Sequence, residues 1–231
     1  MNIGPTSTQH PQAPAAAGAT SSAPPSGPAV TGPAVTGSAA PADALRPYRG
    51  RTILVRRLSE QDPVPAITAL LHRAYAKQVK MGLRPLAGRQ DDSVTRRRIH
   101  SGECSLAIDT SGLTPADTFD GAIVGVIILN EIEPDNGPDW FTRPGVASFS
   151  QLAVDPAAQG AGIGRALLAT VERRAAELGN TELGLSMAEP DVQLRQFYQR
   201  SGYRIVATWK WPYTNYLSLI LSKSLTPVPK A

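Results

Sequence analysis

Hydrophobic and polar positions alternate with two different periods along this chain, and the changes of period predict the order of its strands and helices. The segment that Asp62 and Pro63 open has Ile67, Leu70 and Leu71 at helical spacing, whereas residues 53–58 alternate as a strand does. Strands are expected at 53–58, 104–109, 122–130, 146–154, 183–187, 203–209 and 216–221. Helices are expected from about residue 62, and over about 92–100, 162–178 and 191–201.

The order of these elements indicates the class of fold. Strands follow one another in the middle of the chain without a helix between them, whereas strands and helices alternate later. A strictly alternating order would favour a doubly wound parallel sheet, and this order favours a mixed sheet instead. We therefore predict an α/β domain of the α+β kind, with a central sheet of about six to seven strands and about four flanking helices.

The beginning of the chain differs from the rest in composition. Residues 1–47 are dominated by Ala, Pro, Gly, Ser and Thr, and they almost repeat the phrase Gly-Pro-Ala-Val-Thr-Gly. Such a segment buries too little apolar area to offset the entropy of the chain. We predict a disordered tail over 1–47 and one folded domain over 48–226, which has room for a sizeable core.

Composition also disfavours several classes of function. The chain lacks the features of a secretory signal and any apolar stretch long enough to span a membrane. Its single Cys104 excludes an internal disulfide, and its three histidines lack metal-ligand spacing. The net charge is +4, but apart from Arg96 to Arg98 the basic residues are scattered. We expect a cytoplasmic protein with no metal, no membrane and no nucleic acid as partners.

A glycine-rich turn lies between the strand that ends at Val154 and the next helix. It reads Gln159-Gly160-Ala161-Gly162-Ile163-Gly164-Arg165. Small residues leave backbone N–H groups uncovered, and the first turn of a helix adds unpaired N–H groups and the positive end of its dipole. The turn is therefore typical of a loop that binds an anionic cofactor through its pyrophosphate.

Spacing distinguishes between the known kinds of phosphate loop. In a dinucleotide-binding frame that begins at Gly160, Arg165 stands where the last small residue should be. A nucleoside-triphosphate loop needs a Lys, and none lies between Gly160 and Glu182. The turn instead fits Gln/Arg-x-x-Gly-x-Gly/Ala, and it resembles the signature of the GNAT superfamily of N-acetyltransferases.

The resemblance extends to both sides of the turn. Residues 151–156 are similar to the family's fourth strand, whose splayed end receives the pantetheine arm of acetyl-CoA. The residues Phe197-Tyr198 and Gly202-Tyr203 are similar to a helix that ends in Tyr-x-x-x-Gly-Phe. The resemblance implies the GNAT fold, acetyl-CoA as co-substrate without a metal, and direct attack of a primary amine in a ternary complex. The cofactor-binding residues that it implies are Leu152, Ala153, Val154, Gln159, Gly160, Ala161, Gly162, Ile163, Gly164 and Arg165.

The resemblance also assigns catalytic roles. Backbone N–H at or beside Leu152 would stabilise the oxyanion, and Tyr198 would be the general acid for the thiolate, because a phenol pKa near 10 is suitable. Many members have Glu or His on the fourth strand, where this chain has Ser148 and Ser150. We therefore expect waters to carry the amine proton to a more distant carboxylate, Glu131 or Glu133, and Glu131 is the predicted base.

A further departure from the family is Asp191, which stands where many relatives have Asn. An Asp at this position is expected to cap the helix that follows, although its charge suits an anionic ligand less well. This residue is therefore not among the predicted cofactor contacts.

The resemblance implies that the acceptor lies between the loops 81–92, 131–145 and 210–215. Acidic residues beside Trp140 and Phe141, with Trp211 and Tyr213, would suit a cationic amine that has an apolar or ring portion. A small amine and a protein amine both stay open, and a homodimer through the last strands is implied only by analogy. The alternative class of function is a non-catalytic acyl-CoA-binding regulatory or interaction module, which the missing Glu or His favours and Tyr198 disfavours.

Overall fold

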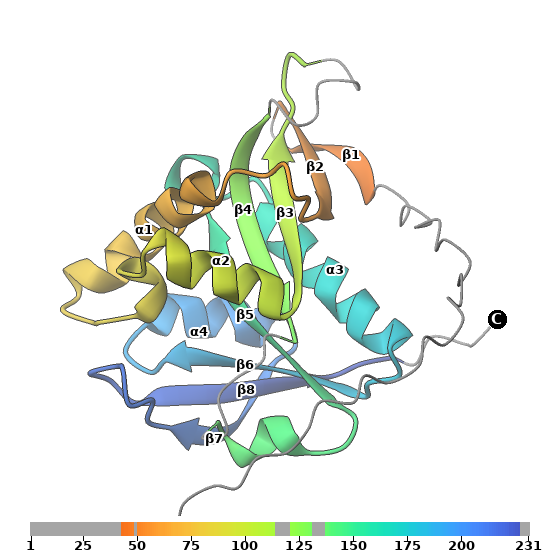
Figure 1. Ribbon diagram of the computed structural model, residues 1–231. Coiled ribbons are helices and arrows are strands. Elements are labelled where there is room, and N and C mark those ends of the chain that lie inside the picture. Colours follow the sequence, from red (N-terminus) through yellow and green to blue (C-terminus); the bar gives the residue numbers. More distant parts are fainter. Residues whose placement is uncertain (1–42, 49, 114–120, 131–136, 227–231) are drawn as a thin grey trace, which may run out of the picture. The chain divides into compact units, whose positions relative to one another are not determined.

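The described part of the chain is built around a sheet of eight strands in the order β1-β2-β3-β4-β5-β6-β8-β7 (Figure 1). The computed structural model describes residues 43–48, 50–113, 121–130 and 137–226, all within the unit 39–231. Neighbouring strands are antiparallel, except that β5 and β6 are parallel. The strands are β1 (Asp43–Tyr48), β2 (Arg51–Arg57), β3 (Glu103–Asp109), β4 (Ala122–Leu129), β5 (Val146–Val154), β6 (Glu182–Ala188), β7 (Arg204–Trp209) and β8 (Ser218–Ser224). The predicted mixed sheet is thus confirmed.

Strand β1 is an addition to the predicted sheet. It pairs with β2 at the sheet edge, and Tyr48 lies opposite Arg51 across a turn in which Gly50 has a φ of 79°. An edge strand needs a partner on one side only and tolerates a proline such as Pro47, so its composition gave little sign of a strand. Residues 43–47, which were expected in the tail, belong to this strand. Residues 1–42 lie outside the described residues, so the disorder expected of them stays a prediction.

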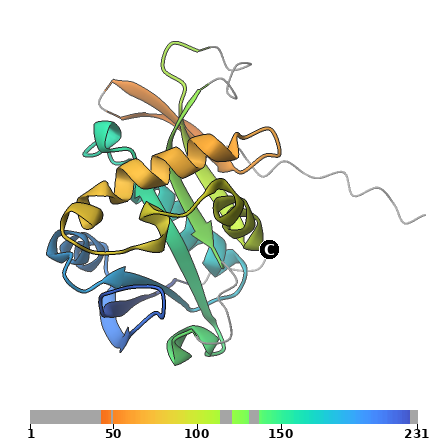
Figure 2. The ribbon, with the colours of Figure 1, turned by 60° about the vertical axis from the view of Figure 1, so that its left-hand side comes forward.

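Among the described residues, four α-helices cover the two faces of the sheet (Figures 1 and 2). Helices α1 (Val64–Lys80) and α2 (Asp92–Ser101) pack on one face, with buried Leu54, Leu106, Val126 and Ile128 beneath them. Helices α3 (Ile163–Glu177) and α4 (Val192–Arg200) belong to the core of the opposite face. The short 3₁₀ turns are η1 (Leu86–Gly88), η3 (Asp139–Thr142) and η4 (Pro156–Ala158).

Local chemistry explains where the helices begin. Asp91 accepts a hydrogen bond from the backbone N–H of Val94 at 2.9 Å and so caps α2. Asp62 does not cap α1, which begins at Val64. It forms an ion pair with Arg56 at 2.6 Å and accepts from the Ser59 N–H at 2.7 Å.

Strand β5 behaves differently at its two edges. Along β4, Ser150 lies opposite Ile128 and Ala153 opposite Val126, so β5 holds one extra residue, and Gln151 there has a left-handed φ of 51°. Because of this bulge the strand changes faces: Phe149 packs in the core under α3, whereas Ala153 packs in the core under α1. Along β6, the pairing ends where Phe149 meets Leu185. Beyond that pair the two parallel strands diverge.

Candidate active site

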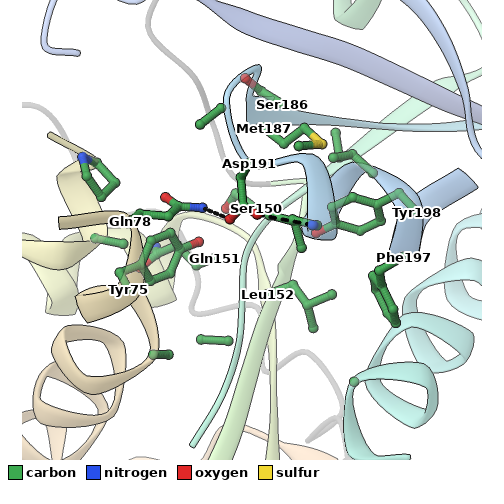
Figure 3. A pocket seen from close by; sticks show the side chains of 18 of the residues that line it. Tyr75, Gln78, Ser150, Gln151, Leu152, Ser186, Met187, Asp191, Phe197 and Tyr198 are labelled. Carbon is green, nitrogen blue, oxygen red and sulfur yellow. Dashed lines mark hydrogen bonds between the residues drawn. The ribbon is translucent and has the colours of Figure 1, made fainter. Parts of the chain in front are cut away.

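A cavity of about 610 Å³ lies where β5 and β6 diverge. Figure 3 shows Phe197 and Tyr198 of α4 on one side of the opening and Tyr75, Gln78 and Gln151 on the other. Residues of η1, η3 and the β7–β8 loop also line the cavity. The site therefore combines a strand opening with side chains from both layers of helices.

The part of the cavity beside α3 is built from consecutive residues. In η4, the N–H of Ala157 donates to Asp155 at 2.9 Å, and the Gln159 Nε2 donates to the Val154 carbonyl at 3.2 Å. Gly160 and Gly162 then adopt left-handed φ values of 77° and 86°, and Gly162 precedes the first residue of α3. These conformations leave the first turn of α3 open to an anionic ligand, as coenzyme A would require.

The predicted cofactor residues gather around this loop. Those that line the cavity are Leu152, Ala153, Val154, Gln159, Gly160, Gly162, Ile163, Gly164 and Arg165. Ala161 does not line it, because its side chain is turned into the hydrophobic core beneath α3.

Tyr198 reaches the cavity from α4 and is 4% exposed. Its ring packs against Phe149, Phe197 and Tyr203, with centroids at 6.1, 5.3 and 5.8 Å. Burial raises the pKa of its phenol far above the ordinary value, and the neighbouring Tyr75 and Asp191 act in the same direction. No described residue forms a hydrogen bond with its hydroxyl. The phenol is thus held rigidly in its protonated form.

Asp191 caps α4, as expected: its Oδ1 accepts from the N–H of Leu194 at 3.1 Å. Its Oδ2 accepts from the Nε2 of Gln78 at 3.1 Å, and the ammonium of Lys77 lies 3.9 Å from Oδ1. Of the described residues that line the cavity, Asp191 is the only one with a carboxylate. Its charge is shared with partners on α1, so it joins α1 to α4 across the opening.

The part of the cavity opposite the glycine loop is built from distant segments. Trp211 is 6% exposed, donates to the Ser186 Oγ at 2.9 Å and stacks on Tyr213 with centroids 5.6 Å apart. Phe141 lies against Gly184, where a Cβ would come within 2.7 Å of its ring. These aromatic residues line the cavity, as predicted. Trp140 does not, and the guanidinium of Arg143 lies 4.2 Å above its ring.

Two loops beside this part are hydrogen-bonded to each other. Asn215 accepts from the N–H of Arg84 at 2.8 Å and donates to the Gly82 carbonyl at 2.9 Å. Arg89 donates to the Tyr213 carbonyl at 2.7 Å. The segment after α1 (residues 82–89) and the turn before β8 (residues 213–215) are therefore joined, and we call this pair of loops the tied roof.

The acidic residues that were predicted beside the acceptor are not among the described residues that line the cavity. Glu131, Glu133 and Asp135 lie outside the described residues, so the role of Glu131 stays a prediction. Asp139 is exposed and does not line the cavity.

Sequence reasoning missed several lining residues, including Tyr75, Gln78, Arg98 and the side chain of Gln151. Helices α1 and α2 carry the first three, and no local motif marks which of their residues meet β5. Gln151 belongs to the segment 151–156 that resembles the family's fourth strand, but the resemblance assigns roles there to backbone groups and not to the Gln151 side chain.

Comparison with known proteins gives the decisive observation. The model of the acetyltransferase (GNAT) family matches residues 83–203, more than half of the chain. The chain belongs to the GNAT family of acetyltransferases. The match runs from the loop after α1 to just beyond α4, and this segment contains most of the residues that line the cavity.

Solved structures share the GNAT fold with this chain at low sequence identity. The ribosomal-protein-S18-alanine N-acetyltransferase of Escherichia coli has a TM-score of 0.54 and 15% identity, and the match covers 78% of this chain and 97% of that one. A GCN5-related N-acetyltransferase from Kribbella flavida has a TM-score of 0.54 and 22% identity, with 75% and 98% covered. A GNAT family acetyltransferase from Elizabethkingia anophelis, solved with acetyl-CoA bound, has a TM-score of 0.50 and 18% identity, with 75% and 98% covered.

Two further findings complete the comparison. No curated protein matches the sequence of this chain. Within the part of the GNAT chain that the structure describes, no helix has the length and apolar character needed to cross a membrane.

Proposed function

We propose that this acetyltransferase moves the acetyl group of acetyl-CoA to a primary amine, which attacks the thioester directly in a ternary complex. The observation that carries the proposal is the position of Tyr198. Its phenol lines the cavity at the gap between β5 and β6, and no described residue competes for its hydroxyl. The glycine loop before α3 opens into the same cavity. Thiolate protonation and cofactor binding are thus supported in one place.

Each step of the transfer has a candidate group. Backbone N–H at or beside Leu152 donates to the thioester oxygen as the amine nitrogen bonds to the carbonyl carbon. The carbon–sulfur bond then breaks, and the Tyr198 hydroxyl gives its proton to the departing thiolate. The amine proton leaves through waters held by Ser148 and Ser150, which line the cavity from β5, toward Glu131.

The raised pKa of Tyr198 is compatible with this role. Burial disfavours the phenolate, and it would disfavour a thiolate formed beside it for the same reason. Burial would thus shift the pKa of both groups in the same direction, so it does not by itself oppose the proton transfer. The phenol also stays protonated throughout the ordinary working range of pH.

The shape of the cavity favours a small acceptor over a protein chain. Hydrogen bonds hold residues 82–89 and 213–215 together beside the aromatic part of the cavity. This favours a bounded pocket there, whereas a protein acceptor would need an open groove. Trp211, Tyr213 and Phe141 would contact an apolar or ring portion of the amine.

The test is thiol release from acetyl-CoA over a panel of small amines and peptides. Tyr198→Phe should lower kcat by about 10²-fold or more and leave acetyl-CoA binding within about threefold, because the ring is kept and only the proton donor is lost. Tyr203→Phe is the matched control: its hydroxyl bonds Glu172 at 3.1 Å, and it does not line the cavity. Acetyl-CoA binding without release to any amine would support the binding-module alternative instead.

A further inference from the structure

Gln151 occupies a strained position in the middle of the candidate site. Its φ of 51° is left-handed, a conformation that costs a non-glycine residue energy and that persists only when its surroundings hold it. The other described non-glycine residue with a positive φ is an asparagine, Asn130, a residue type that tolerates this region. A glutamine at this point of β5 therefore needs an explanation.

The side chain of Gln151 has one anchor. Gln151 is 5% exposed, its Oε1 accepts from the Nε2 of Gln90 at 3.2 Å, and its own Nε2 has no partner. An unpaired amide donor is unfavourable in a buried site, and the bond from Gln90 is the one side-chain hydrogen bond that Gln151 forms with the described residues. This bond joins the bulge of β5 to the segment before α2.

The direction of that bond is fixed from α2. Arg98 is only a donor, and its guanidinium donates to the Oε1 of Gln90 at 3.0 Å. The Nε2 of Gln90 must then point the other way, where it donates to the Thr95 Oγ1 at 2.8 Å and to Gln151. The order Arg98, Gln90, Gln151 therefore sets which atom of each amide faces the next.

We infer that Gln151 is a positioning residue for the oxyanion site. The hydrogen bond from Gln90 holds Gln151 in its left-handed conformation, and this conformation turns the backbone of Leu152 toward the gap between β5 and β6. The inference rests on the proposed function, in which backbone N–H at or beside Leu152 stabilises the oxyanion. Since Arg98 also lines the cavity, the same chain of bonds links a second lining side chain to the reacting carbonyl.

This role predicts an unusual order among variants of Gln151. Gln151→Met keeps the volume of the side chain but loses the anchor, and it remains strained at a positive φ. Gln151→Gly loses both volume and anchor, but glycine adopts a positive φ without steric cost. If the residue only filled space, methionine would be the better replacement. If the residue holds the backbone in its left-handed conformation, glycine would be the better replacement.

The experiment measures kcat, the KM for acetyl-CoA and Tm for the full chain and both variants, with the best amine of the panel as probe. Gln151→Met should lower kcat by about tenfold or more. The loss should be smaller than the roughly 10²- to 10³-fold loss in kcat that follows complete removal of an oxyanion donor. The KM for acetyl-CoA should stay within about threefold. Gln151→Gly should lose at least about threefold less kcat than Gln151→Met, although its Tm falls further. Gln151→Glu can still accept the hydrogen bond from Gln90, so its kcat should also be higher than that of Gln151→Met.

Three outcomes would overturn the inference. Gln151→Met could keep the kcat of the unaltered chain, or Gln151→Gly could lose as much as Gln151→Met, and either result leaves the proposed function standing. If the unaltered chain binds acetyl-CoA but transfers to no amine, the proposed function fails and this inference fails with it. A variant too unstable to assay is replaced by Gln90→Met, which removes the same anchor from outside the cavity and should lower kcat as Gln151→Met does.

Discussion

The two parts of the cavity are built in opposite ways. The part beside α3 comes from consecutive residues between Val154 and Arg165, and it presents mainly backbone groups of small residues. The part beside the tied roof comes from side chains of η1, η3, β6 and the β7–β8 loop. The first depends on a few backbone conformations, whereas the second depends on distant side chains meeting. A family can therefore keep one cofactor and change its acceptor.

The largest expected effect comes from altering the backbone part. Gly162→Val should weaken acetyl-CoA binding by about 10- to 100-fold, because a β-branched residue is strained at a φ of 86°. Isothermal titration with acetyl-CoA measures this. Gly164→Ala is the matched control, since a Cβ there meets only ordinary contacts at 3.7 and 3.8 Å, and its affinity should change less than about threefold. Equal losses in both variants would contradict a role of the left-handed turn.

The side-chain part should affect the acceptor instead. Trp211→Phe removes the hydrogen bond to Ser186 and part of the stack on Tyr213. The KM for the amine should rise by about 5- to 10-fold, and acetyl-CoA binding should stay unchanged. Steady-state kinetics with each substrate varied in turn separate the two constants. A matching rise in the KM for acetyl-CoA would mean that the two parts are not independent.

A smaller effect is expected from untying the roof. Asn215→Ala removes the hydrogen bonds to Gly82 and Arg84, which hold the loops together without touching the main cavity. We expect the KM for the amine to rise by about two- to threefold, since exposed hydrogen bonds contribute little each. Faster proteolysis near residues 82–89 would accompany it. An unchanged KM with faster cleavage would show that the roof does not select the acceptor.

The smallest effect concerns stability alone. Although burial acts in the other direction, hydrogen bonds from Arg204, Ser222 and Ser224 lower the pKa of Glu182 to about 2. Because this pKa lies below the ordinary value of 4.5, the stabilisation is complete above about pH 4.5 and is lost as pH falls toward 2. Glu182→Gln should therefore lower Tm by a few degrees near neutral pH and progressively less in acid, with both KM values unchanged. Thermal unfolding monitored across pH tests this.

The backbone part could be predicted from the sequence, and the side-chain part only partly. The glycine turn, Tyr198 and the cap at Asp191 depend on neighbours within a few residues, so their pattern carries the information. The bulge at Gln151 depends on pairing with β4 and on Gln90 of another segment, which no local pattern records. Strand β1 was missed because its pairing uses backbone groups at a sheet edge.

The parallel contact between β5 and β6 has a consequence for how the molecule comes apart. This contact joins the group of strands β1–β5 to the group β6–β8, and on β5 it involves only the residues from Val146 to Phe149. The adjoining antiparallel ladder between β6 and β8 runs the full length of β6. Parallel pairing between distant segments forms slowly, and a short ladder exchanges its amide hydrogens early. We expect the contact between β5 and β6 to open first, which hydrogen exchange would detect. Acetyl-CoA bound across it would slow that opening, so amide protection along β5 and β6 would report cofactor occupancy without any turnover.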